Sequence, residues 1–169
     1  MISFETTFLD YPSPDDIAVI AFLSGCSHHC LGCQNPELQE MHEIFDEEAS
    51  NNIIDHIKEL CKRNETNKLV LSGGDPLAEC NRNLTIHICK LLGKNSEYNY
   101  DICIYTGYNI EEVKGMGISG FKFIKCGKFD PYTMRKSEKT DEYIQFVNET
   151  QNLYDSDYKQ LSHFGRYYF

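Results

Sequence analysis

A continuous apolar segment at residues 17–23 ends at Ser24-Gly25, and three closely spaced cysteines follow it at once. An apolar run without polar alternation is typical of a strand that is buried on both faces, as in a parallel sheet. Further short strands are expected at residues 68–72, 101–105 and 121–125, each followed by a glycine within two residues. The segments between them have helical periodicity, and the expected helices cover residues 47–63, 81–93 and 110–114.

Strands that alternate with helices predict an α/β fold with a parallel sheet. A full eight-stranded barrel takes about 250 residues, whereas this chain has 169. We therefore expect a single domain over residues 1–169, built as a small incomplete (open) TIM-like barrel with a parallel sheet of five or six strands. Residues 143–147 are a candidate for one of the later strands. Ligands of such folds bind beyond the carboxyl ends of the strands, which is where the distinctive segments of this sequence lie.

The three clustered cysteines are Cys26, Cys30 and Cys33, with the spacing C-x3-C-x2-C. Three thiolates on one loop can hold three corners of a 4Fe–4S cluster and leave the fourth iron open to a substrate. Structural zinc is the alternative, with His28, His29 or a distant cysteine as the fourth ligand. Structural zinc sites usually contain two short ligand pairs, and the other five cysteines of this chain stand singly. The spacing favours iron–sulfur chemistry, and a zinc-stabilised interaction module is the competing hypothesis.

The composition limits where such a chain can work. Met1–Asp10 carries two acids and no base, unlike a signal peptide, and no apolar run reaches the length of a membrane span. Eight cysteines without a signal sequence favour a reducing compartment, so we expect a cytoplasmic protein that does not associate with membranes. A formal net charge of −10 disfavours direct binding to nucleic acid.

The second expected strand leads into Gly73-Gly74-Asp75-Pro76. Two glycines allow a ligand to approach the main chain, and a carboxylate next to them can form a charge-assisted hydrogen bond with an amine. With this segment and the cysteine loop in the same order and strand context, the chain resembles radical S-adenosylmethionine enzymes. The resemblance implies that Gly73, Gly74 and Asp75 bind the cosubstrate S-adenosylmethionine near its methionine amine.

Three segments narrow the resemblance to the activating proteins of anaerobic ribonucleotide reductases. They are residues 25–35 around the cysteines, Tyr105-Thr106-Gly107-Tyr108, and Gly127-Lys128-Phe129. The resemblance implies that Tyr105, Thr106 and Lys128 are further candidate contacts to the cosubstrate, although a structural role would also explain each of them. The sequence departs from the pattern at Gln34, where an aromatic residue is common, and at Cys126, where an acid is common.

The resemblance implies an iron–sulfur activase that cleaves S-adenosylmethionine reductively to a 5′-deoxyadenosyl radical and generates a glycyl radical on an anaerobic ribonucleotide reductase. A flavodoxin-like protein would donate the electron. Two alternatives lie within the superfamily: an activase of another glycyl-radical enzyme, and an enzyme that acts on a small molecule. The aromatic residues of the stretch 148–169 are expected to pack against the domain, with docking of a protein partner as the alternative.

Overall fold

A computed structural model describes residues 2–7, 11–12, 17–136, 143–148, 150–163 and 166–167. The helices are α1 (Glu47–Arg63), α2 (Glu79–Leu92) and α3 (Ile110–Gly115), with the 3-10 turns η1 (Pro36–Leu38) and η2 (Pro131–Thr133). The strands are β1 (Ile2–Thr7), β2 (Ala18–Leu23), β3 (Lys68–Gly73), β4 (Asp101–Thr106), β5 (Phe123–Cys126), β6 (Met134–Lys136), β7 (Tyr143–Asn148), β8 (Asn152–Asp155), β9 (Ser162–His163) and β10 (Arg166–Tyr167).

Six strands form the main sheet in the order β1-β2-β3-β4-β5-β8. The four central strands, β2 to β5, are parallel, as expected. The expectation of a purely parallel sheet is wrong, because β1 is antiparallel to β2 and β8 is antiparallel to β5. Among the described residues β1 and β8 are the two ends of this order, so the sheet is open, and a TIM-like barrel is not confirmed.

The two antiparallel edges have a physical cause in the connections that lead to them. A parallel crossover usually needs a dozen or more residues and carries a helix, whereas antiparallel neighbours need only a short connection. Residues 8–17 alone separate β1 from β2. Between β5 and β8 the described residues form η2 and the two-stranded sheet of β6 and β7. They form no crossover helix of the kind that usually precedes a parallel strand, and β8 pairs antiparallel with β5.

Most elements that the sequence predicts are present. α1 has the predicted bounds, and Asp46 caps its first turn by accepting from the Ala49 amide. α3 lies where a helix over residues 110–114 is expected, and Asn109 caps it. The strand expected at residues 143–147 exists as β7, but it pairs with β6 outside the main sheet. In the stretch 148–169, Tyr154 and Tyr158 pack against the core as expected, whereas residues 164–165 and 168–169 lie outside the described residues.

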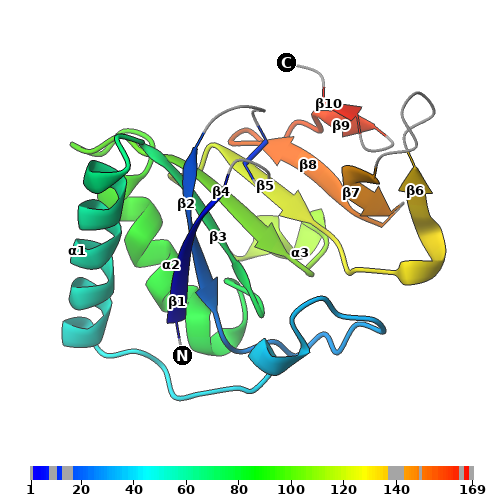
Figure 1. Cartoon of the computed structure of the whole chain (residues 1–169), viewed down its shortest axis with the longest axis horizontal. Coiled ribbons are helices and arrows are strands. Elements are labelled where there is room, and N and C mark those ends of the chain that lie inside the picture. Colours follow the sequence, from blue (N-terminus) through cyan, green and yellow to red (C-terminus); the bar gives the residue numbers. More distant parts are fainter. Residues whose placement is uncertain are drawn as a thin grey trace.

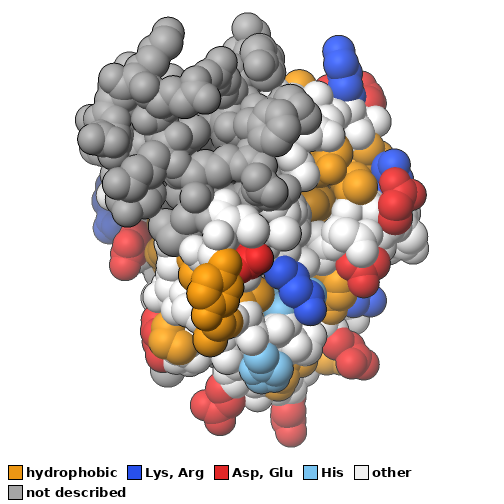
Figure 2. Space-filling view, turned by 90° about the vertical axis from the view of Figure 1, so that its right-hand side faces the viewer, with side chains coloured by type: hydrophobic (Ala, Val, Ile, Leu, Met, Phe, Trp, Pro, Cys, Tyr) orange, Lys and Arg blue, Asp and Glu red, His pale blue; other side chains and the backbone are white. Residues whose placement is uncertain are grey.

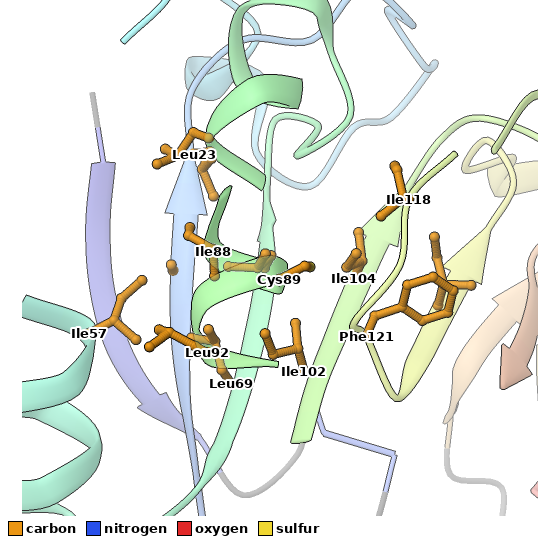
Figure 3. Close-up of a cluster of buried hydrophobic side chains, with 14 of the residues drawn as sticks. Leu23, Ile57, Leu69, Ile88, Cys89, Leu92, Ile102, Ile104, Ile118 and Phe121 are labelled. Atoms are coloured by element: carbon orange, nitrogen blue, oxygen red, sulfur yellow. The ribbon is translucent and has the colours of Figure 1, made fainter. Parts of the chain in front are cut away.

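One face of the main sheet is covered by the three helices (Figure 1). Alternate strand residues such as Leu69, Ile102 and Ile104 pack there against side chains of the helices, including Ile57 and Ile88 (Figure 3). The hydrophobic core therefore lies mainly between the sheet and its helical layer.

The opposite face of the sheet carries no helix among the described residues. The residues that alternate with the first set form a smaller apolar cluster there, with Ile20, Val70, Cys103 and Phe123 on four neighbouring strands. Because side chains alternate across a strand, the next outward positions toward the carboxyl ends of β2 to β5 point to this same face. These positions form the floor of the candidate site.

Candidate functional site

A cavity of about 500 Å³ lies at the carboxyl ends of the parallel strands, on the helix-free face of the sheet. Each central strand contributes side chains to its floor: Ile20 and Phe22 from β2, Ser72 from β3, Tyr105 from β4 and Lys125 from β5. The loop that follows β2 and the turn that follows β3 border the cavity as well. The site thus lies where ligands of open α/β sheets bind.

The cysteine loop brings all three predicted thiols to this cavity. Cys26, Cys30 and Cys33 line it, with Cys26 buried and the other two half-buried. Burial raises the pKa of the Cys26 thiol, a hydrogen bond from the main-chain N–H of His28 opposes the rise, and the charges of Asp75, Cys30 and Cys33 add to it. The three thiols therefore border one common space.

The chemistry of this donor set fits a cluster held at three corners. Thiolates are the protein ligands of 4Fe–4S clusters, and all three thiols here belong to one loop and border one cavity. His28, the loop histidine that borders the cavity, has its Nε2 atom 2.8 Å from Asp75 Oδ2. Among the described residues no group of three or more Cys, His, Asp or Glu side chains is arranged to hold a single metal ion.

The Gly73-Gly74 turn packs directly against the base of the cysteine loop. The Gly74 amide donates to Leu23 O at 2.7 Å, and the Asp75 amide donates to Gly25 O at 2.8 Å. A Cβ atom at position 74 would lie only 2.6 Å from Gly25 O, so the close approach of the two backbones requires glycine there. Both glycines line the cavity, and their contact with a cosubstrate stays a prediction.

Asp75 lies behind the cavity lining and is fully buried. Its Oδ1 atom accepts from the Leu77 amide at 2.8 Å, and its Oδ2 atom accepts from the Gly107 amide at 2.9 Å. The Thr106 hydroxyl lies within hydrogen-bond distance of both oxygens, and His28 contacts Oδ2. The contact between Asp75 and a cosubstrate stays a prediction, and in this arrangement it would require His28 to move.

The remaining predicted contacts differ in their placement. Tyr105 and Thr106 line the cavity, whereas Lys128 is exposed and lies outside the lining. Lys125 lies on the floor instead, with its Nζ atom 4.5 Å from the centre of the Tyr105 ring. The alternation within β5 already places Lys125 on the face opposite Ile124, but the sequence does not say which face is left uncovered by helices.

Asn81 and His42 form a polar cluster that holds the start of the cysteine loop in place. Asn81, on α2, is fully buried and its Nδ2 atom donates to Ser24 O and to Asp75 O, each at 2.9 Å. His42 Nε2 lies 3.0 Å from both Ser24 O and Asn81 Oδ1. One side chain of α2 thereby ties the start of the cysteine loop to the turn after β3. No motif in the sequence points to Asn81 or His42 as residues of the site.

The outer surface near the cavity has exposed hydrophobic side chains. Leu31 in the cysteine loop is 63% exposed and Tyr132 in η2 is 84% exposed. The two segments are neighbours, because a Cβ atom at Gly32 would lie 3.6 Å from Pro131. On the face toward β6, Figure 2 shows acidic side chains mostly around the left, lower and right edges, with hydrophobic, basic and histidine side chains nearer the middle.

None of the helices in the described part of the chain has the length and apolar character needed to cross a lipid bilayer.

Comparison with known proteins gives one family and a set of related proteins. Residues 17–152 match the family described as the 4Fe-4S single cluster domain. The matched segment contains the cysteine loop, the Gly73-Gly74 turn and the four parallel strands β2 to β5. No solved structure gives a significant match to the chain.

The related proteins all carry the name anaerobic ribonucleoside-triphosphate reductase-activating protein. The one from Haemophilus influenzae is 32% identical over 94 residues, which cover 54% of this chain and 59% of that protein. The one from Pasteurella multocida is 33% identical over 95 residues, covering 55% of this chain and 58% of that protein. The one from Enterobacteria phage T4 is 27% identical over 107 residues, which cover 62% of this chain and 65% of that protein. The matched part is thus less than two thirds of each relative.

Proposed function

Because this chain belongs to the family of 4Fe-4S single cluster domains, we propose that it is an iron–sulfur activase that generates a glycyl radical on an anaerobic ribonucleotide reductase. The names of its relatives and its resemblance to radical S-adenosylmethionine enzymes support the proposal. The single observation that carries it is the convergence of Cys26, Cys30 and Cys33 with Gly73 and Gly74 on one cavity.

In this proposal Cys26, Cys30 and Cys33 would hold the 4Fe–4S cluster through their thiolates. When bound and reduced, the cluster would supply the electron for cleavage of S-adenosylmethionine to methionine and a 5′-deoxyadenosyl radical, and that radical would abstract hydrogen from a glycine Cα of the reductase. The glycine turn lets the cosubstrate approach the main chain closely, because no side chain projects from Gly73 or Gly74. Tyr105 and Thr106 border the same space and are proposed contacts.

The position of the acidic and basic groups refines these roles. Asp75 supports the Thr106-Gly107 segment from behind by accepting hydrogen bonds from the Thr106 hydroxyl and the Gly107 amide, and its main-chain N–H donates to Gly25 O before the cysteines. Lys125 is the basic residue of the cavity lining, and a carboxylate or hydroxyl of the cosubstrate would suit it. Lys128 lies outside the lining, so a contact from it would come from the rim.

The proposed substrate is a protein because a primary alkyl radical must be kept from water. The main sheet is open, and the cavity lies on its helix-free face at the carboxyl ends of the parallel strands, bordered by loops. A glycine-bearing loop of a large reductase could cover the cavity while its surroundings dock on exposed groups such as Leu31 and Tyr132. A flavodoxin-like protein is the proposed electron donor.

The test begins with anaerobic purification and reconstitution with iron and sulfide. The expected protein is brown, binds about four iron atoms per chain, and loses both properties in Cys30→Ala but not in Ser27→Ala, an exposed position of the same loop. With a reductant, the protein is expected to cleave S-adenosylmethionine and to produce a glycyl radical signal in electron paramagnetic resonance when a reductase is added.

The outcomes separate the competing hypotheses. Stoichiometric zinc without iron after anaerobic reconstitution would favour the zinc-stabilised interaction module and reject the enzyme. Cleavage of S-adenosylmethionine without a glycyl radical on anaerobic ribonucleotide reductase would support the proposed cofactors. It would also indicate that the substrate is another glycyl-radical enzyme or a small molecule.

A further inference from the structure

His28 is the one histidine of the cysteine loop whose side chain is buried, being only 8% exposed although its neighbours Ser27 and His29 are exposed. Its Nε2 atom lies 2.8 Å from Asp75 Oδ2, which is 47 positions away in the sequence. The ring packs edge-on against Tyr108, with the centroids 4.5 Å apart. The side chain therefore joins the loop after β2 to segments after β3 and β4.

The partner of this imidazole is a fixed anchor. The Asp75 side chain is 1% exposed, and its two oxygens also receive hydrogen bonds from the Leu77 amide, the Thr106 hydroxyl and the Gly107 amide. A carboxylate held by donors from two other segments has little freedom to follow a moving loop. A Cβ atom at Gly107 would collide with the His28 ring, so the ring fills a space that only glycine leaves open.

The main chain of the same residue acts on a cluster ligand. The His28 N–H donates a hydrogen bond to the Cys26 sulfur, which counteracts part of the effect of burial on the pKa of that thiol. Hydrogen bonds to ligating sulfurs are among the protein features that set the reduction potential of an iron–sulfur cluster. Such a bond stabilises the more negatively charged, reduced state and therefore raises the potential.

We propose that His28 is a positioning residue whose imidazole, locked to Asp75, holds its own main-chain N–H against the Cys26 sulfur and so raises the reduction potential of the bound cluster. The chain on either side of His28 is exposed, and His29 adopts a positive φ of 48°. The contact of the imidazole with the buried Asp75 carboxylate therefore anchors the residue that carries this N–H between two exposed neighbours. The inference rests on the cluster of the proposed function but not on the identity of the reductase.

The main experiment is a redox titration of the reconstituted protein, followed by electron paramagnetic resonance and carried out without S-adenosylmethionine. His28→Ala is expected to keep its iron and to shift the potential to a more negative value. His28→Gln is expected to restore most of the wild-type value, because its side-chain amide can donate to Asp75 from nearly the same place as Nε2. His29→Ala is the matched control: His29 is exposed, its Nδ1 atom lies 3.2 Å from Gln39 Oε1, and no shift of the potential is expected.

A second measurement does not need the cluster. In the metal-free protein, the His28 amide is expected to exchange its hydrogen at least tenfold faster in His28→Ala than in the wild type or in His28→Gln. An unchanged potential together with unchanged exchange in His28→Ala would overturn the role of His28. Failure of the wild-type chain to take up iron would overturn the proposed function instead, so the two failures are distinguishable.

Discussion

Replacing Asn81 by alanine tests whether the polar cluster under the cysteine loop holds the site together. The change removes the two hydrogen bonds of 2.9 Å that Nδ2 donates to Ser24 O and Asp75 O, whereas the 3.5 Å contact to Gly25 O is too long to count. It also removes the 3.0 Å contact of Oδ1 with His42 Nε2, which keeps Ser24 O as a partner. Both carbonyls keep another partner, since Ser24 O is 3.0 Å from His42 Nε2 and Asp75 O accepts from the Ala78 amide at 3.1 Å. The full penalty of an unsatisfied buried group therefore does not apply.

The expected loss follows from these contacts. Two net hydrogen bonds at about 1 kcal/mol each, together with a small buried cavity, lower the free energy of unfolding by about 2–3 kcal/mol. For a chain of this length that corresponds to a fall in Tm of about 4–12 °C. Because Asn81 joins the loop root to the glycine turn, Asn81→Ala is also expected to retain less iron after reconstitution than the wild type.

The matched control is Asn83→Ala on the same helix. Asn83 is exposed, so its replacement changes the free energy of unfolding by no more than about 0.7 kcal/mol, in the stabilising direction because alanine favours helix. The assay is denaturant unfolding of the metal-free protein under reducing, anaerobic conditions, followed by circular dichroism. Equal midpoints for Asn81→Ala and Asn83→Ala would refute the reasoning.

Three further predictions concern the glycine turn, a buried thiol and the cavity floor. Gly74→Ala should lower iron retention several-fold, because its Cβ would meet backbone atoms, whereas Gly115→Ala, with nothing within 4 Å, should not. Burial raises the pKa of Cys89 to about 12, so this thiol should resist iodoacetamide at pH 8, and stability should fall as pH rises from about 9 toward 12, where only the unfolded thiol loses its proton. Denaturation midpoints that stay constant over that range would contradict this. Lys125→Gln should weaken S-adenosylmethionine binding about tenfold by calorimetry, and Lys128→Gln should weaken it less.

The elements that the sequence predicts well are those whose signals are local. α1 follows from its apolar spacing, acids in the first turn and bases in the last, and the Asp46 side chain adds the cap. The parallel strands follow from short apolar runs that end near glycine. The order of the cysteines and the glycine turn along the chain indicated that they would meet, because parallel strands end at the same edge.

Features that depend on contacts between distant segments could not be predicted from the sequence. β1 carries only Ile2 and Phe4 as apolar residues, and its pairing depends on β2. The contact between His28 and Asp75 spans 47 positions and depends on how two loops settle against each other. Lys128 was a candidate because of the resemblance, whereas Lys125 reaches the cavity because helices cover only the opposite face of β5.

The two faces of the main sheet have different roles, and this division has an evolutionary consequence. Folding depends on residues such as Ile102 and Ile104, which pack under the helices, while Tyr105 and Lys125 project to the other side and touch the cavity. A substitution at position 105 or 125 can therefore alter ligand preference while the helical layer keeps its packing. Descendants of such a chain could diversify their chemistry one floor position at a time without first acquiring extra stability.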